Sequence, residues 1–137
     1  MHAQNRFWPV MARIFGDEFL HKNNDKDKNA AIAERKDFLK RHHIALWDVL
    51  SECEITGASD SSINKELPND FSEILASSKI AWIFCTGKTA FNLYKKHCSQ
   101  KYSTPFSYLP STSPANQAVW PTEKLTEEYR KEILRFV

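Results

Sequence analysis

The sequence Ile80-Ala81-Trp82-Ile83-Phe84-Cys85-Thr86-Gly87-Lys88-Thr89-Ala90 decides the fold class. Residues 80–85 form a continuous apolar run, which is typical of a buried strand. The run passes through a Thr-Gly-Lys turn into a segment whose apolar residues recur at helical spacing: Ala90, Phe91, Tyr94 and Cys98. We therefore predict a buried strand, a tight turn at Gly87 and a helix, in that order.

A further strand and a stiff loop follow this unit. Residues 106–109 predict a strand, and the loop Pro110-Ser111-Thr112-Ser113-Pro114 comes directly after it. The two prolines restrict the backbone of this loop and leave three hydroxyl side chains between them. Beyond the loop, residues 122–136 predict a helix with an apolar stripe formed by Leu125, Tyr129, Ile133 and Phe136.

The residues upstream predict more helices and one more strand. Phe7, Val10, Met11, Ile14 and Phe15 lie on one face of a helix that Gly16 ends. We expect a solvated loop over 21–29, a helix over 30–42 and a buried strand over 44–50. A turn and short helix over 57–65 and a helix from Pro68 to Leu75 complete the expected elements.

The alternation of strands and helices predicts an α/β fold with a short, mostly parallel sheet and helices on both faces. No linker or internal repeat divides the sequence, so we expect a single domain over residues 1–137. Ligands of parallel sheets bind beyond the carboxyl ends of the strands. The turn at Gly87 and the loop at Ser111 both follow predicted strands, and we expect both at that rim.

Composition excludes several classes of protein. The 137 residues contain 19 basic and 17 acidic residues, a net charge of +2 that by itself does not indicate nucleic acid. Cys53, Cys85 and Cys98 lack zinc-site spacing and are too few for a four-cysteine iron–sulfur cluster, so we expect buried thiols. No apolar run approaches the roughly 18 residues of a membrane span, and the start resembles no signal peptide. We predict a cytoplasmic protein without a membrane partner.

Two segments could bind an anion, and each has a plainer alternative. Short hydroxyls and backbone N–H groups between Leu109 and Asn116 could hold phosphate oxygens, although an ordinary Ser/Pro turn would have the same composition. The turn Thr86-Gly87-Lys88 could place an anion at a helix N-terminus, or could simply begin a helix. It lacks the first glycine of a P-loop, which argues against a binding site for a nucleoside triphosphate.

Single polar residues leave similar choices open. Asn5 precedes the first helix and could cap it or act on a ligand. Asp48 interrupts the predicted strand over 44–50, where it could serve a site or bond to backbone. The pair His42-His43 fits the end of a helix, where positive charge is favoured.

Several segments together resemble the hypoxanthine-DNA glycosylase branch of the uracil-DNA glycosylase superfamily. Asn5-Arg6-Phe7-Trp8-Pro9 is similar to the Asn-x-Phe-Trp segment of that branch. Residues 35–50, Pro68-Asn69-Asp70-Phe71, residues 86–90 and the loop from Leu109 to Asn116 also resemble family segments in the same order. The resemblance implies a three-layer α/β/α sandwich. The Gly-x-x-Pro-Gly-like first motif of the family, with its first strand, is absent, so we expect an N-terminally truncated domain, a start further upstream, or another element in its place.

The resemblance implies a monofunctional DNA-repair glycosylase. Such an enzyme flips a deaminated base out of DNA and hydrolyses its N-glycosidic bond. We expect hypoxanthine as the base, with uracil as a second substrate, and no metal or cofactor. Asn5 would be catalytic and would orient water or the flipped base. The base pocket would contain Phe7, Asp48 and Thr86, and DNA would contact Gly87, Lys88, Ser111, Thr112, Ser113, Ala115 and Asn116.

Three positions depart from the family pattern. Thr86 stands where many relatives have Asn, and Leu109 stands where the standard uracil branch has a catalytic His. Ala115 takes the place of an intercalating Leu, so the resemblance implies a weak wedge and a preference for disrupted pairs. The alternatives are a truncated, non-catalytic DNA-binding module and an unrelated α/β domain with a chance match. The oligomeric state stays open.

Overall fold

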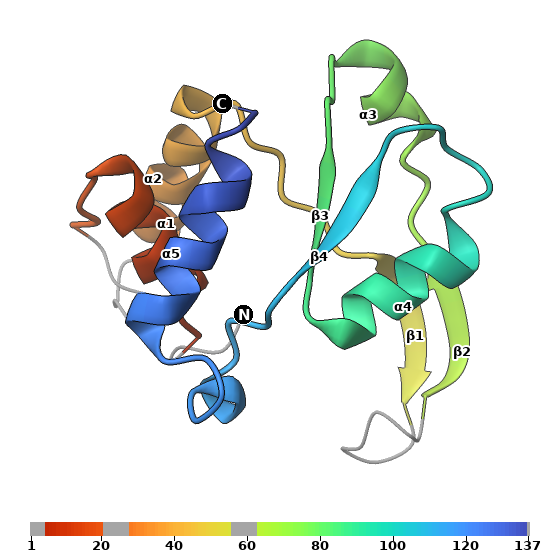
Figure 1. Cartoon of the computed structure of the whole chain (residues 1–137). Helices are drawn as coiled ribbons and strands as arrows, with labels where there is room; N and C mark the ends of the chain where they lie inside the picture. The colour runs from red at the N-terminus through yellow and green to blue at the C-terminus, as the bar shows by residue number, and fades with distance from the viewer. Residues whose placement is uncertain (1–4, 21–27, 56–62, 137) are drawn as a thin grey trace. The chain divides into compact units, whose positions relative to one another are not determined.

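The computed structural model describes residues 5–20, 28–55 and 63–136 (Figure 1). The chain divides into two compact units. The first unit comprises Met1–Leu46 and Leu109–Val137, and the second comprises Trp47–Tyr108. We describe the two units one after the other, because each has its own core and its own group of candidate residues.

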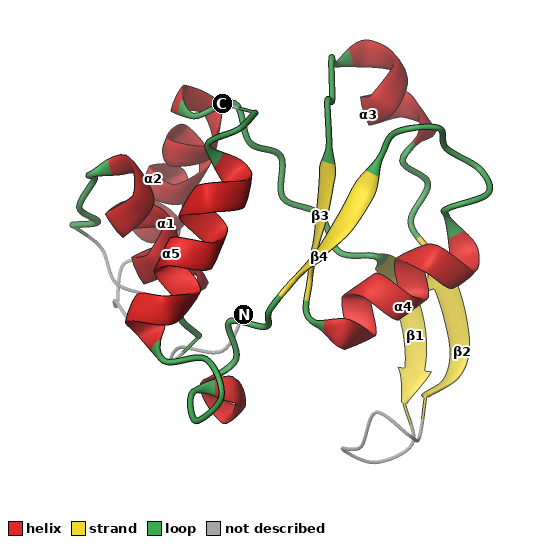
Figure 2. Ribbon diagram, viewed as in Figure 1, coloured by secondary structure: helices red, strands yellow, loops and turns green. Residues whose placement is uncertain are grey.

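The first unit is helical. It contains α1 (Phe7–Phe15), α2 (Lys28–Arg41), the 3₁₀ turn η2 (Pro114–Asn116) and α5 (Thr122–Ile133), all visible in Figure 2. Gly16 ends α1 in the left-handed region with φ of 68°, and its N–H donates to the carbonyl of Ala12. The glycine stop predicted from the sequence is therefore confirmed, as are the helices that were expected over 30–42 and 122–136.

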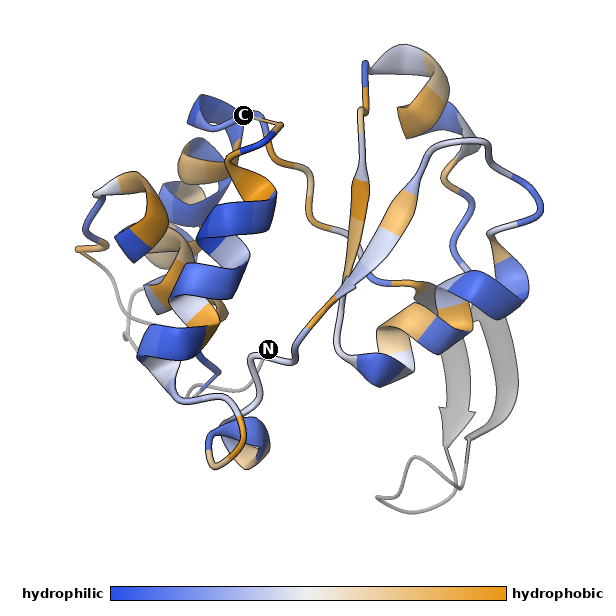
Figure 3. Ribbon diagram, in the orientation of Figure 1, coloured by the Kyte–Doolittle hydropathy of each residue, from blue (hydrophilic) through white to orange (hydrophobic). Residues whose placement is uncertain are grey.

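The core of the first unit lies between these helices. The side chains of Val10, Met11, Phe38, Leu125 and Tyr129 are almost completely buried. Hydrophilic and hydrophobic residues alternate along α5 in Figure 3, as expected for a helix that buries one face. The apolar spacing of α1 and α5 in the sequence thus identified four of these five residues, and the fifth, Phe38, lies in α2.

The second unit contains the predicted strand–turn–helix. Strand β3 (Ile83–Thr86) leads into α4 (Lys88–His97), and β4 (Phe106–Leu109) pairs with β3 in parallel. Phe71, Cys85, Tyr94 and Cys98 form its buried cluster. The α/β class with a short parallel sheet is confirmed, and β3 begins three residues later than the apolar run suggested.

A hairpin that the sequence did not predict completes the second unit. Strands β1 (Leu50–Ile55) and β2 (Ile63–Pro68) pair antiparallel, with Cys53 opposite Glu66. The strand expected over 44–50 is wrong, because residues 44–48 are irregular and the side chains of Leu46 and Trp47 are 43% and 54% exposed. The part of the short helix expected over 57–65 that the structure describes, residues 63–65, belongs to β2, and residues 57–62 lie outside the described ranges.

The helix expected from Pro68 begins later. Pro68 ends β2, and α3 spans Ser72–Ser77. The carboxylate of Asp70 accepts hydrogen bonds from the N–H and hydroxyl of Ser72, 2.9 and 2.6 Å away. This local turn precedes Phe71, the N-cap of α3, so the helix starts after it and not at Pro68. Across the described ranges, no helix is long and apolar enough to cross a membrane.

Candidate functional site

Asn5 and the Ser111 loop meet in the first unit. The amide oxygen of Asn5 accepts a hydrogen bond from the N–H of Phe7 at 2.9 Å and another from the hydroxyl of Thr112 at 2.8 Å. These two donors occupy both lone pairs of the oxygen. Among the described residues, no group accepts a hydrogen bond from the amide nitrogen of Asn5. Asn5 lies one residue before Arg6, the N-cap of α1, and its side chain fixes the turn that leads into the helix while its NH₂ group remains a donor.

The carbonyl groups of the loop face inward. Each of four consecutive carbonyl oxygens accepts a hydrogen bond from a group of the first unit. The donors are Tyr129 Oη to Pro110 at 2.5 Å, Asn116 Nδ2 to Ser111 at 3.1 Å, Arg6 N to Thr112 at 3.0 Å and Arg6 Nη2 to Ser113 at 3.2 Å. Bonds from residues far apart in the sequence thus fix the direction of the loop backbone.

The donors of the loop are left on its other side. The Ser111 hydroxyl accepts from the N–H of Ser113, and the Ser113 hydroxyl accepts from the N–H of Ala115, so each hydroxyl proton can still be donated. Within the described ranges, the N–H groups of Ser111 and Thr112 have no acceptor. Such a concentration of N–H and O–H donors suits an anion.

Thr112 and Ala115 occupy different positions in this loop. The Thr112 side chain is 6% exposed, and its hydroxyl proton goes to Asn5, so its hydroxyl positions that residue. Ala115 lies exposed in η2. Asn116 bonds back to Ser111 and closes the loop. The sequence analysis grouped these residues in one loop. It could not tell that Ser111 and Ser113 keep hydroxyl protons to donate, whereas Thr112 and Asn116 bond within the unit.

Arg6 is a site residue that the sequence analysis missed. Its side chain is only 7% exposed, and its guanidinium donates to the carbonyl of Trp120 at 2.6 Å as well as to that of Ser113. No carboxylate in the described part of the chain forms an ion pair with it. Arginine is mostly a surface residue. The only feature of the sequence that could have indicated its burial is its position between Asn5 and an apolar helix.

The second unit holds the other predicted residues. Gly87 precedes α4 with φ of 95° and ψ of 157°, a conformation that side chains with a Cβ rarely adopt. Thr86 and Lys88 flank it and are exposed. Asp48 is exposed in the irregular segment before β1, and its carbonyl accepts a hydrogen bond of 2.6 Å from Asn69. The strand position expected for Asp48 is therefore wrong.

Phe7 is the remaining predicted pocket residue. It lies in the first turn of α1, is 6% exposed, and packs edge-on against Trp8 with ring centroids 4.9 Å apart. Its contacts are those of a core residue that also fixes the start of α1 beside Asn5.

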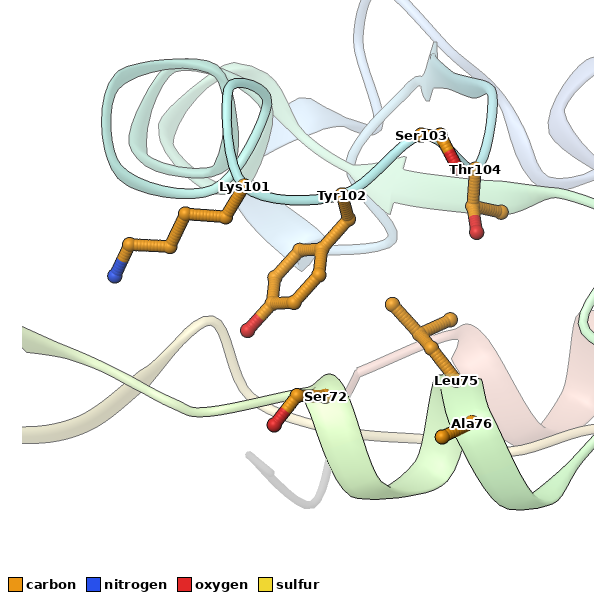
Figure 4. Close-up of a pocket in the computed structure, with 7 residues that line it drawn as sticks. All are labelled: Ser72, Leu75, Ala76, Lys101, Tyr102, Ser103 and Thr104. Atoms are coloured by element: carbon orange, nitrogen blue, oxygen red, sulfur yellow. The ribbon is translucent and has the colours of Figure 1, made fainter.

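A shallow pocket of about 320 Å³ in the second unit contains none of the predicted site residues. Figure 4 shows Tyr102 and Leu75 pointing into the space between α3 and the segment 101–104; the lining consists of Ser72, Leu75, Ala76, Lys101, Tyr102, Ser103 and Thr104. The Tyr102 hydroxyl accepts from the N–H of Phe71 and donates to Asp70. Tyr102 therefore ties this segment to the start of α3.

The buried cysteines are poor nucleophiles. Burial raises the pKa of the Cys85 thiol to about 11, and burial likewise raises the pKa of Cys98. Both thiols are neutral near pH 7 and pack in the core of the second unit, as predicted from the sequence. The side chain of Cys53 lies outside the described residues. Neither Cys85 nor Cys98 therefore offers a thiolate near pH 7.

Comparisons with known proteins found a matching family and a similar solved structure. The model of the uracil DNA glycosylase superfamily matches residues 1–137. No curated protein sequence matches the chain. A solution structure of a candidate uracil DNA glycosylase from Methanosarcina acetivorans is similar, with 26% sequence identity and a TM-score of 0.68, over 96% of this chain and 75% of that one.

Proposed function

The chain belongs to the uracil DNA glycosylase superfamily, and from that premise we propose that it excises a deaminated base, hypoxanthine first and uracil second, from DNA. The superfamily consists of DNA glycosylases, so DNA is the partner that family membership supports. The base specificity is the finer part of the proposal and rests on the resemblance of Asn5-Arg6-Phe7-Trp8 to the hypoxanthine branch.

One observation carries the proposal: the loop that presents donors to an anion is hydrogen-bonded to the residue proposed to act on the base. Thr112 donates to Asn5 at 2.8 Å, and the adjacent Ser111 and Ser113 retain free hydroxyl protons. A glycosylase needs both functions side by side, because the phosphates beside the flipped nucleotide must be held while the bond breaks.

The hydrogen bonds of Asn5 limit what it can do chemically. In the reaction, the oxygen of water forms a bond to the sugar C1′, the C1′–N bond breaks with its electron pair going to the base, and the proton that the water loses passes to the departing base, directly or through solvent. The oxygen of Asn5 already accepts two hydrogen bonds, so it has no lone pair to take a proton from water. We assign Asn5 the role of a donor whose NH₂ stabilises negative charge on the departing base or orients the oxygen of the water.

A donor at this place also favours deaminated bases. Deamination replaces an exocyclic amino group, which donates, by a carbonyl oxygen, which accepts. The Asn5 amide is held in one orientation by Phe7 and Thr112, so it cannot turn its oxygen toward an amino group without losing both bonds. The cost of the mismatch is that of leaving polar groups unpaired.

The residues of the second unit have supporting roles in the proposal. Thr86 and Asp48 would border the base pocket. Gly87, whose conformation brings backbone to the start of α4, and the exposed Lys88 would contact DNA phosphate. Cytoplasmic location likewise stays a prediction.

The experiment uses duplexes with a single deoxyinosine or deoxyuridine, incubated with the purified chain and then treated with alkali. Strand breaks at the deoxyinosine, with few at deoxyuridine and none in the undamaged duplex, are the expected result. Asn5→Ala should abolish the breaks. Binding of all duplexes without any break would indicate a non-catalytic DNA-binding module, and failure to bind DNA would contradict the proposal as a whole.

A further inference from the structure

Arg6 links the two ends of the η2 turn in the first unit. Its Nη2 donates to the Ser113 carbonyl at 3.2 Å and its Nη1 to the Trp120 carbonyl at 2.6 Å, with Thr122 Oγ1 a further 3.5 Å contact of Nη1. Its backbone N–H also donates to the Thr112 carbonyl. One residue therefore holds the segment before η2 and the segment after it in a fixed relation.

The charge on this side chain is unusual for its surroundings. The guanidinium is buried, and its Nε has no hydrogen-bond partner in the described part of the chain. Carbonyl oxygens surround it in place of a carboxylate. A buried cation without a counterion costs free energy unless something offsets it. A bound anion on the donor side of the loop would supply that offset.

We propose that Arg6 is a positioning residue for phosphate binding: it orients the donors of Ser111–Ser113 toward a DNA phosphate without touching the phosphate itself. This inference rests on the proposed function, because it takes DNA as the source of the anion. The backbone N–H of Arg6 draws the Thr112 carbonyl inward, so the N–H of the same peptide, that of Ser113, turns outward and donates to the Ser111 hydroxyl at 3.1 Å, which leaves the proton of that hydroxyl available for a phosphate. The guanidinium holds the Ser113 carbonyl and so fixes the residue whose hydroxyl accepts from Ala115.

The role requires the fork of an arginine. Two nitrogen atoms of one planar group reach two carbonyls that belong to different segments. A lysine would preserve the charge but would offer a single ammonium group, which cannot hold both carbonyls in this geometry. The pair of substitutions Arg6→Lys and Arg13→Lys therefore separates geometry from charge, because Arg13 is exposed in the same helix.

The first measurement is the affinity of each variant for a deoxyinosine duplex, by fluorescence anisotropy over a series of salt concentrations. It is made at a temperature where circular dichroism reports both variants folded. Arg6→Lys should raise Kd about tenfold, as expected for the loss of about one hydrogen bond to a charged group. The slope of log K against log salt should stay unchanged, and Arg13→Lys should bind like the unaltered chain.

The second measurement needs no DNA. The amides of Asn116 and Trp120 donate within the loop to Ser113 and Asn116, and their hydrogen exchange reports whether the loop keeps its shape. Exchange at both amides should become about tenfold faster in Arg6→Lys, which corresponds to a loss similar to that in affinity. Arg6→Gln, a neutral donor, is measured beside it with the same expectations for affinity and exchange, and takes its place should the lysine variant fail to fold.

The outcomes separate the inference from the proposed function. If the unaltered chain does not bind DNA, the proposed function fails, and the exchange rates still decide whether Arg6 holds the loop. Unchanged affinity and exchange in Arg6→Lys would overturn the inference. A salt slope that is smaller by about 0.9 in Arg6→Gln alone would mean that Arg6 contacts a phosphate directly, which also overturns it.

Discussion

The Ser111 loop of the first unit and the Gly87 turn of the second each follow a strand, but their shapes are held in different ways. The Ser111 loop depends on Arg6 and Tyr129, which come from distant parts of the chain and bond to its carbonyls. The Gly87 turn depends on its own backbone conformation and on the helix that begins at Lys88. One is held by long-range polar contacts and the other by local geometry, so the two should respond to different substitutions.

The strongest test of the first region is Asn5→Asp. An aspartate keeps an oxygen for the bonds from Phe7 and Thr112, so the turn before α1 remains fixed, but it replaces the NH₂ donor by a negative oxygen. We expect kcat for deoxyinosine release to fall about 100-fold, the effect of losing one donor that stabilises developing charge. The melting temperature should change little.

A fall in both activity and melting temperature would instead mean that Asn5 serves the fold alone. Asp48→Asn in the second unit is the control, because it exchanges the same two side chains in the opposite direction and also changes the net charge by one. Its side chain is exposed, and the change should not affect the melting temperature.

One buried tyrosine in each unit allows the stabilising effect of its hydroxyl to be compared between the units. Tyr129→Phe removes the hydroxyl that donates to Pro110, leaves a buried carbonyl unpaired, and should lower the free energy of unfolding by about 2 kcal/mol. Tyr94→Phe removes a buried hydroxyl that has no partner in the described residues, and should be neutral or slightly stabilising. Urea unfolding of both variants measures the difference. Equal losses would show that polar contacts do not distinguish the two regions.

The local character of the second region is tested by Gly87→Ala. At φ of 95° and ψ of 157° a Cβ strains the backbone, which should cost about 1.5 kcal/mol. Gly16→Ala is the matched control, because Gly16 has φ of 68° and a Cβ there would meet nothing within 4 Å. Its cost should be about 1 kcal/mol. Thermal unfolding should therefore rank the two variants, and the reverse order would contradict the assignment of strain to the Gly87 turn.

The smallest effect is expected from pH. The hydrogen bond from His42, 2.7 Å away, and the nearby Arg41 lower the pKa of Asp17 in the folded chain. A lowered carboxyl pKa adds stability that is complete above the unfolded value of 3.8 and is lost as pH falls through the folded value. Asp17→Asn should therefore reduce stability at pH 6 and have a much smaller effect at pH 2, as measured by urea unfolding. A loss of equal size at both pH values would exclude an electrostatic origin.

The sequence predicted the elements that depend on local contacts better than those that depend on contacts between distant residues. The strand, turn and helix at residues 80–97 and the stop at Gly16 are local patterns, and the structure has them nearly where expected. The hairpin β1–β2 was missed because alternating residues on short strands carry a weak signal, and Asp48 was consequently misplaced.

The candidate site shows the same limit. Family resemblance brought Asn5 and the Ser111 loop to attention, and their hydrogen bond through Thr112 could not be foreseen from spacing, because more than a hundred residues separate the partners. Arg6 was missed for a related reason. Its importance comes from carbonyl groups, which every residue carries and no sequence pattern reveals.

The four bonds that hold the carbonyls of residues 110–113 all end on main-chain oxygen. The shape of the Ser111 loop is therefore largely independent of which side chains it displays. Ala115, which none of these bonds touches, can therefore be exchanged for a bulky apolar residue to change what the loop displays to a ligand, while the backbone beneath keeps its shape.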